Sequence, residues 1–276
     1  MTDLYRVCLI FPDENPHAAC FREIGLLILS ALKSNNFDCD LSINNLHPDR
    51  INIIIGYHLI TFHDNLKNFR YIPYQLEQLH SREFPFNSNM EAILRHALTI
   101  WDYSIENINF LKTKKLHARL LLPGYHENLE MIKEIKDEKK NFDILFYGSV
   151  GERRKKILDE LAKHCKVKLL LGVYGEKRDE WIRRSKIILN VHHYSTLLFE
   201  AVRVSYLLNN RCTVLSENST DYCFDKVNLC SARYENIVET CLDLLKNKEK
   251  REILRMQNYN DFKINYEMTK LIKNVL

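Results

Sequence analysis

The sequence predicts an α/β protein with two doubly wound, mostly parallel sheets. Three observations support this class. Short apolar runs alternate with longer stretches of helical period, which is the pattern of parallel strands covered by helices. The chain has 276 residues, which suits two domains of about 100 to 200 residues better than one core. Hydrophobic residues make up 46% of it, as in an ordinary globular protein.

The first lobe is predicted over residues 1–122. Its opening strand, "YRVCLIFP", is followed by a helix over 17–36 that ends at Asn35 and Asn36. The other strands are expected at 37–42, 51–56, 69–74, 98–104 and 118–123, with helices at 89–98 and 105–115. Each strand is a short apolar run, and each helix has apolar residues at a spacing of three and four.

The second lobe is predicted over residues 142–276. Its strands are expected at 142–148, 167–172, 186–191, 212–217 and 227–232, and its helices at 152–164, 176–185, 197–209 and 234–246. The remaining tail, 250–276, has helical period but no following strand. Two placements are open for this tail: it crosses back to the first lobe, or it packs on its own lobe.

Proline and glycine mark the boundary between the lobes. All six prolines lie before residue 124, while five of the seven glycines lie between 124 and 175. We therefore predict a linker over 123–141, with "NLEMIKEIKDEKK" as a charged helical connection at the surface.

Charge and composition exclude several classes of protein. The net charge is +4, from 40 basic and 36 acidic residues, which is too balanced for a dedicated duplex-DNA binder. No apolar run reaches the roughly 18 residues of a membrane span, and the N-terminus lacks the pattern of a signal peptide. We expect a cytoplasmic protein that does not bind nucleic acid, and peripheral membrane contact is left open. The eight cysteines include no C-x-x-C pair, so we expect reduced core thiols and no metal site.

The residues just after the strands of the second lobe carry the functional signal, because ligands of open α/β sheets bind beyond the carboxyl ends of the strands. After "FDILFY" comes "GSVGERRKK". Gly148 permits close backbone approach, and Arg153 and Arg154 open the next helix. Backbone N–H groups and arginines at such a place bind phosphate. A solvated charge run is the competing interpretation.

Two more turns follow strands of this lobe. "GVYGEKRDE" places Tyr174 and Gly175 where a nucleobase could contact an aromatic face, although an ordinary turn would look the same. "NVHHYSTLLFE" places His192 and His193 side by side, and adjacent strand residues face opposite sides, so they are poorly arranged to chelate one metal. Ser195 and Thr196 suit the N-cap of the following helix.

That helix, "LLFEAVRVSYLL", is apolar nearly all round, and Glu200 and Arg203 are its only charges. Buried charges are rare unless they are paired or hold a ligand. Their spacing allows an internal salt bridge. The alternative is that Glu200 accepts hydrogen bonds from ribose hydroxyls.

Several of these segments resemble the nucleotide-binding half of GT-B glycosyltransferases. They are "FYGSVGERRKK", "GVYGEKRDEWIRRSKIILNVHHY" and "LLFEAVRVSYLLNNRCTVLSE". In the first lobe, "YIPYQLEQL", "IWDYSIENI" and "LLPGY" are similar to the same small bacterial and viral glycosyltransferase-like group, which includes the spore-maturation CgeB-like proteins and glycosyl transferases group 1. The resemblance implies two Rossmann-like domains that face each other across a cleft. It also implies a donor nucleotide on the C-terminal domain and an acceptor on the N-terminal one.

The resemblance further implies roles for particular residues. Glu200 matches the family's ribose-binding glutamate, the turn at Gly148 with Arg153 or Arg154 would face the diphosphate, and 172–175 would face the base. The residues expected to bind the donor are Gly148, Ser149, Arg153, Arg154, Tyr174, Gly175, His192, His193, Tyr194, Ser195, Thr196, Glu200 and Arg203.

One departure from the family leaves the stereochemistry open. Many retaining members have a glutamate seven residues before the ribose-binding one, where this chain has His193. An inverting enzyme needs a base for the acceptor hydroxyl. The candidates are, in order, His17 and Asp13 after the first strand and then Glu77 in "YQLEQL".

The sequence thus predicts a glycosyltransferase that needs no metal or other cofactor and uses a UDP- or GDP-sugar as donor. Its acceptor would be a glycan, lipid or protein, as in polysaccharide biosynthesis. The alternatives are a non-catalytic GT-B-like module that binds nucleotide or glycan and, less favoured, a binder of single-stranded nucleic acid through its 14 tyrosines.

Overall fold

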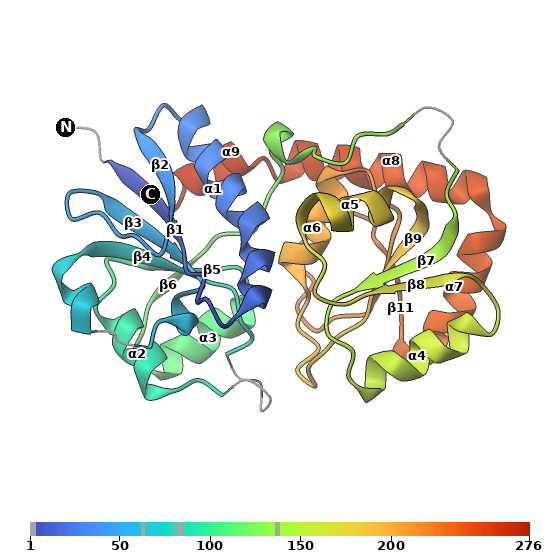
Figure 1. Ribbon diagram of the computed structural model, residues 1–276, viewed down its shortest axis with the longest axis horizontal. Helices are drawn as coiled ribbons and strands as arrows, with labels where there is room; N and C mark the ends of the chain where they lie inside the picture. The colour runs from blue at the N-terminus through green and yellow to red at the C-terminus, as the bar shows by residue number, and fades with distance from the viewer. Residues whose placement is uncertain (1–3, 62–63, 80, 82–84, 136–138) are drawn as a thin grey trace. The chain divides into compact units, whose positions relative to one another are not determined.

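A computed structural model describes residues 4–61, 64–79, 81, 85–135 and 139–276 of the chain. It divides into two compact units (Figure 1). Unit 1 comprises residues 1–128 together with 267–276, and unit 2 comprises 129–266. The range 123–141, expected as a linker, is divided between the two units, and the last ten residues group with unit 1, which is one of the two placements left open for the tail.

Unit 1 contains a six-stranded parallel sheet in the order β2-β1-β3-β4-β5-β6. The strands are β1 (Tyr5–Leu9), β2 (Cys39–Ile43), β3 (Ile51–Ile55), β4 (Arg70–Gln75), β5 (Ile100–Asp102) and β6 (Ala118–Leu120). The helices are α1 (Arg22–Ser34), α2 (Ser88–Arg95), α3 (Ile105–Thr113) and α9 (Met268–Lys273), with 3-10 turns η1 (Pro16–Phe21), η2 (Tyr57–Leu59), η3 (Asp64–Asn68) and η4 (Glu127–Leu129). The strand order reverses between β1 and β3. Ligands are therefore expected beyond the carboxyl ends of these two strands.

Unit 2 contains a five-stranded parallel sheet in the order β11-β10-β9-β7-β8. The strands are β7 (Phe142–Tyr147), β8 (Val167–Leu170), β9 (Ser185–Asn190), β10 (Val214–Glu217) and β11 (Cys230–Ala232). The helices are α4 (Glu152–Ala162), α5 (Gly175–Arg183), α6 (Ala201–Asn209), α7 (Ile237–Lys246) and α8 (Lys248–Asn265), with the 3-10 turn η5 (Tyr234–Asn236). The order of strands reverses between β7 and β9.

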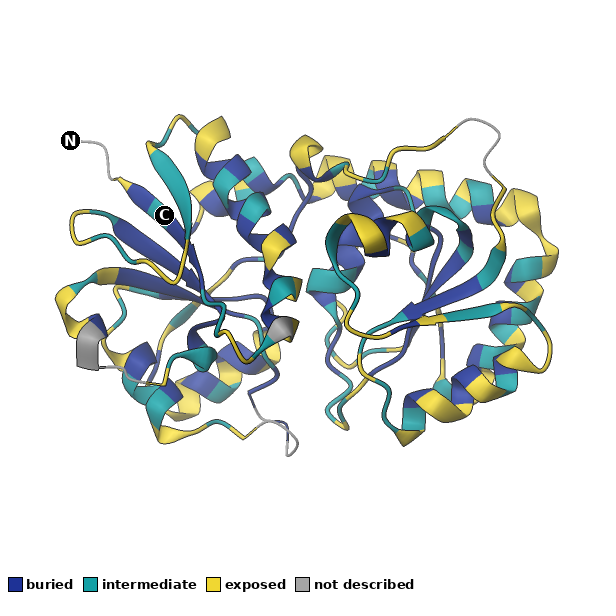
Figure 2. Cartoon of the chain, viewed as in Figure 1, coloured by how far each residue is buried: buried dark blue, intermediate teal, exposed yellow. Residues whose placement is uncertain are grey.

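Burial explains why these segments form parallel strands. All five residues of β3, "INIII", are buried, because helices cover both faces of a parallel sheet. The polar one, Asn52, donates hydrogen bonds to the carbonyls of His47 and Arg70. Figure 2 shows the same contrast: central strands are drawn as buried, whereas the helices alternate buried and exposed positions. The predicted α/β class with two parallel sheets is confirmed.

Two local predictions were wrong. The described part of the segment 130–141 forms no helix. Asn210 holds its first residues, because it accepts a hydrogen bond from the Ile132 amide at 2.7 Å and donates one to the Leu129 carbonyl at 2.9 Å. Helix α6 begins at Ala201 and not at 197, because Leu197 has a left-handed φ of 55° that no helix allows.

Candidate nucleotide site

The candidate site of unit 2 lies at the carboxyl ends of β7, β9 and β10. Strand β7 pairs with β8 on one side and with β9 on the other, so the connections leave in opposite directions at the ends of β7 and β9. This switch point is where open α/β sheets bind ligands. Gly148 follows β7, Asn190 ends β9 and Glu217 ends β10.

Glu200 is the N-cap residue of α6 and its side chain is 16% exposed. Oε2 accepts a hydrogen bond from Asn190 Nδ2 at 2.9 Å and lies 2.9 Å from His192 Nδ1. Oε1 lies 3.6 Å from the guanidinium of Arg154. Within the described structure this buried oxygen accepts no hydrogen bond, so it is available to a donor from a ligand.

The charge on Glu200 is fixed by its neighbours. Burial alone would raise the pKa of Glu200, but His192, Arg203 and Asn190 outweigh it and lower this pKa to about 2. Burial would lower the pKa of His192, but Glu200, Glu217 and the Asn218 carbonyl raise it. Glu200 is therefore a carboxylate at neutral pH, and a carboxylate acts only as an acceptor.

Asn190 organises the centre of the site. Its Nδ2 donates to Glu200 and, at 3.0 Å, to Ser216 Oγ. Its Oδ1 accepts from Arg203 Nη1 at 3.2 Å. Asn190 thus joins Glu200 to Arg203, in place of the direct salt bridge that their spacing allows. Asn190 was not predicted as a site residue from the sequence, although it is the last residue of β9 and so meets the strand-end criterion.

The two arginines at the start of α4 differ in environment. Arg154 is buried and donates to the carbonyls of Val191 and Ser149, each at 2.8 Å. Burial, followed by the nearby Arg203, lowers the pKa of Arg154 to about 10. Through these two hydrogen bonds, Arg154 links the turn at Gly148 to the residue that follows β9. Arg153 forms an ion pair with Glu217 and stacks on Tyr234 at 4.1 Å.

The lysines that follow lie at the surface. Lys155 pairs with Asp159 and both Lys155 and Lys156 are exposed. The interpretation as a solvated charge run therefore holds for Lys155 and Lys156 but not for Arg153 and Arg154.

The turn after β7 depends on Gly148. Its φ is 119°, and a Cβ there would lie 2.8 Å from Arg203 Nη2. We expect Gly148→Ala to reduce the free energy of unfolding by about 1 to 2 kcal/mol, measured by urea denaturation, because it adds backbone strain and displaces Arg203. The matched control is Gly151→Ala, since Gly151 has a φ of −86° and a Cβ there would meet only His193, at 3.8 Å. Equal stability of both variants would contradict the role of Gly148.

The polar side chains between His192 and Glu200 lie in different environments. His192 is buried, whereas His193 and Ser195 are exposed. Nε2 of His192 donates to the Asn218 carbonyl at 3.0 Å, and Nδ1 faces Glu200 at 2.9 Å. Both ring nitrogens of His192 therefore contact protein groups. Ser195 and Thr196 do not cap α6, because Glu200 holds that position. This correction follows from the left-handed Leu197, which delays the helix.

The other predicted donor residues lie at neighbouring strand ends. Ser149 is exposed after β7. Tyr174 is the N-cap residue of α5, and Gly175 begins that helix with a φ of 58°. Tyr194 and His193 contact each other edge to face at 4.8 Å.

The Glu200 and His192 pair has a defined pH dependence. The pKa of Glu200 is lowered from 4.5, so its contribution to stability is present above about pH 4.5 and is lost as the pH falls towards 2. The pKa of His192 is raised from 6.5, so its contribution is complete below that pH and is lost as the pH rises through the folded value. We expect the stability difference between the wild type and Glu200→Gln to be largest between about pH 4.5 and 6.5. Denaturation at several pH values tests this, and a difference that keeps growing towards pH 9 would contradict it.

The base candidates of unit 1 are in unlike settings. Asp13 and His17 are exposed, and the backbone N–H of His17 donates to Asn15 at 3.1 Å. Glu77 lies after β4, its side chain is 22% exposed, and Oε1 lies 3.6 Å from His58 Nε2. Burial raises the pKa of Glu77 to about 7 and lowers that of His58 to about 4. The contact with His58, which follows β3, was not predicted from the sequence.

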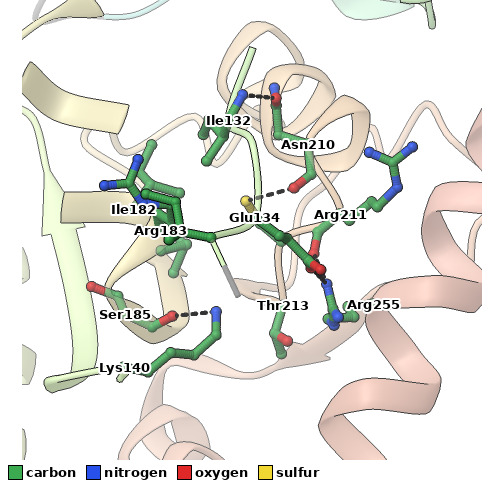
Figure 3. Close-up of a pocket in the computed structure, with 13 residues that line it drawn as sticks. Ile132, Glu134, Lys140, Ile182, Arg183, Ser185, Asn210, Arg211, Thr213 and Arg255 are labelled. Carbon is green, nitrogen blue, oxygen red and sulfur yellow. Dashed lines mark hydrogen bonds and ion pairs between the residues drawn. The ribbon is translucent and has the colours of Figure 1, made fainter. Parts of the chain in front are cut away.

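A separate cavity of about 200 Å³ lies near the amino ends of strands β9 and β10 in unit 2 (Figure 3). Its lining includes Ser185 at the start of β9 and Thr213 just before β10. Three of its four cations have protein partners: Lys140 donates to the Ser185 carbonyl at 3.0 Å, Arg211 pairs with Glu130, and Arg255 pairs with Glu134. This cavity is therefore distinct from the candidate site at the carboxyl ends of β7, β9 and β10.

Neither a metal cluster nor a membrane span is found in the described residues. No group of three His, Cys, Asp or Glu residues there could hold a metal ion. Across the same residues, no helix combines the length and the hydropathy required to cross a bilayer.

The two sheets and the strand-end site define a protein with the GT-B fold. T4 phage BGT in complex with its UDP-glucose substrate matches 99% of this chain and 98% of its own, with a TM-score of 0.65 and 7% identity. A putative UDP-N-acetylglucosamine 2-epimerase from Listeria monocytogenes matches 99% of this chain and 95% of its own, with a TM-score of 0.59 and 12% identity. TarM matches 83% of this chain and 54% of its own, with a TM-score of 0.55 and 13% identity.

Sequence comparison finds relatives in Acanthamoeba polyphaga mimivirus. The uncharacterized protein L137 is 27% identical over 191 residues, which are 64% of this chain and 26% of L137. The uncharacterized protein L140 is 30% identical over 166 residues, which are 56% of this chain and 53% of L140. The chain therefore spans about a quarter and about half of these two relatives. No family model matches the sequence.

Proposed function

We propose that this protein is a glycosyltransferase that takes a sugar from a nucleoside diphosphate donor. The observation that carries the proposal is Glu200: an ionised, largely buried carboxylate at the switch point of unit 2, with one oxygen that accepts no hydrogen bond in the described structure. A ribose diol supplies two O–H donors, and hydrogen bonds to a charged acceptor are the strong ones. The GT-B proteins with bound UDP or UDP-glucose support the same class of ligand.

The diphosphate of the donor would lie against the turn at Gly148 and the start of α4. Gly151 caps α4 without a side-chain hydrogen bond, so the first N–H groups of the helix can bind an anion. Arg153 adds a cation beside them, although Glu217 must share it. These groups stabilise the charge that develops on the leaving diphosphate.

The proposed reaction moves one sugar between two oxygens. The acceptor hydroxyl oxygen forms a bond to the anomeric carbon, and the bond from that carbon to the phosphate oxygen breaks. The nucleoside diphosphate leaves with the electron pair. We assign the hydroxyl proton to Glu77, whose raised pKa suits a group that accepts a proton near neutral pH.

The acceptor we propose is a glycan, lipid or protein. One structural neighbour is the DNA-modifying enzyme beta-glucosyltransferase, so DNA needs separate consideration. Unit 1, which we assign to the acceptor, holds 14 basic and 15 acidic residues. A polyanionic acceptor is bound mainly through clustered Lys and Arg, and this charge balance argues against one.

Two alternatives share the fold. A non-catalytic module that binds nucleotide or glycan would keep the Glu200 site and lack turnover. An epimerase, as in one structural neighbour, would convert the donor without an acceptor.

Calorimetry with UDP, GDP, ADP and CMP, followed by product analysis with the matching nucleotide sugar, separates these cases. Transfer requires nucleotide binding and acceptor-dependent release of nucleoside diphosphate. Binding without turnover would favour the module, a changed donor sugar would favour the epimerase, and absence of binding to all four nucleotides would refute the proposal. Repeating the assay with EDTA tests the expectation that transfer needs no metal.

A further inference from the structure

A buried polar network in unit 1 joins the ends of β4 and β5. Gln75 Nε2 donates to the carbonyl of Glu77 at 2.6 Å and to Asp102 Oδ2 at 3.0 Å. Asn107 Nδ2 donates to the same carbonyl at 2.7 Å and to Asp102 Oδ1 at 3.2 Å. Two amide groups therefore bridge the main chain of Glu77 to the two oxygens of one carboxyl group.

The network also holds the backbone on both sides of that carbonyl. Gln75 Oε1 accepts from the Glu77 N–H at 2.9 Å, and Asn107 Oδ1 accepts from the Leu79 N–H at 3.1 Å. Asp102 Oδ1 accepts a further bond from the Ser104 N–H at 2.8 Å. Each amide thus uses its oxygen on an N–H and its nitrogen on acceptors, so neither can flip without breaking the pattern.

Burial makes this arrangement rigid. Gln75, Asp102 and Asn107 all have an exposed fraction of 0%. A polar network in a site without water is costly unless every member is paired, and it specifies one geometry when it is. Asp102 has no route to a substrate, so it cannot itself take a proton from an acceptor.

The Glu77 side chain, in contrast, reaches the surface beside His58. The ring of His58 is held by Phe21, which packs edge to face against it with ring centroids 5.8 Å apart. Gly56 makes room for Phe21, since its φ is 83° and a Cβ there would lie 3.1 Å from that ring. Within the described residues, the titratable groups around Glu77 are His58 and Tyr57 from η2 and Asp102 from β5.

We propose that Asp102 is a positioning residue that acts through Gln75 and Asn107 to hold Glu77 in place beside His58. The inference rests on the proposed function, in which Glu77 accepts the proton of the acceptor hydroxyl. A displacement of about 1 Å at such a group costs up to about 100-fold in rate. Asp102 therefore influences transfer without touching a substrate.

The test uses Asp102→Asn in the full chain. The substitution keeps the shape of the side chain but places an N–H donor against the N–H donors of Gln75 or Asn107. We expect kcat for transfer to fall about tenfold or more, while the KM for the donor and the affinity for nucleoside diphosphate stay within about twofold, because those belong to unit 2. The acid limb of the pH profile should move to lower pH as Glu77 becomes more exposed.

A second variant and a second measurement keep the inference testable if Asp102→Asn folds poorly. Gln75→Met removes one bridge and leaves that of Asn107, so we expect a smaller loss of kcat in the same direction. Carbon-13 NMR of the Glu77 carboxyl, assigned with Glu77→Gln, should show a titration near pH 7 in the wild type and a lower midpoint in both variants. Folded variants with wild-type kcat and an unchanged Glu77 titration would overturn the inference. If the wild type transfers no sugar, the proposed function fails, and the NMR titration still decides whether Asp102 positions Glu77.

Discussion

Replacing Glu200 by alanine is expected to weaken the binding of nucleoside diphosphate by about 100-fold. In the proposed site the variant would lose two charge-assisted hydrogen bonds to the ribose, each worth roughly 1.5 kcal/mol or more. It also leaves His192 and Arg154, which lie 2.9 and 3.6 Å from the carboxylate, without their anion. Isothermal titration with the nucleotide that binds the wild type measures the loss.

A change of nucleotide separates the ribose contact from a general loss of structure. The wild type should prefer UDP to its 2′,3′-dideoxy analogue, or the corresponding pair for another base, and Glu200→Ala should bind the two almost equally. Glu239→Ala is the matched control, since Glu239 is an exposed residue of α7 in the same unit. A preference for the ribose diol that survives in Glu200→Ala would remove Glu200 from the ribose site.

The strand-end rule explains which parts of the site could be predicted from the sequence. Gly148 directly follows β7, and Glu200 lies in the connection between β9 and α6, so the rule points to both segments. Asn190 and Glu217 end their strands and satisfied the same rule, but each looks like an ordinary polar residue at a strand end. Their importance comes from contacts across neighbouring strands, such as the 3.0 Å bond between Asn190 and Ser216, which the sequence does not encode locally.

The incorrect predictions come from tertiary contacts that override local patterns. "STLLFE" has the cap and the apolar spacing of a helix, yet Asp221 accepts a hydrogen bond from the Phe199 N–H at 2.7 Å. This bond and the left-handed Leu197 keep the chain out of the helix as far as Glu200. The segment 130–135 has helical composition, but Asn210, Arg211 and Arg255 bind it to the rest of unit 2 in a non-helical conformation.

Glu77→Gln is expected to lower the rate of transfer by about 100-fold or more, the typical contribution of a general base. The nucleotide affinity should not change, because Glu77 and Glu200 belong to different units. The wild-type rate should rise with pH through about 7, since burial raises the pKa of Glu77 to about 7 and only its deprotonated form accepts a proton. Steady-state rates from pH 5 to 9 measure both effects.

Variants of the other candidates test whether Glu77, and not His17 or Asp13, is the general base. Glu106→Gln is the control, because Glu106 is exposed on α3 of the same unit. His17→Gln and Asp13→Asn test the two exposed residues after β1. If His17→Gln abolishes transfer and Glu77→Gln retains both the rate and the acid limb, the base lies after β1 and Glu77 has no role in proton transfer. If Glu77→Gln alone removes the acid limb, the buried setting of this carboxylate, and not its place in the sequence, selects it as the base.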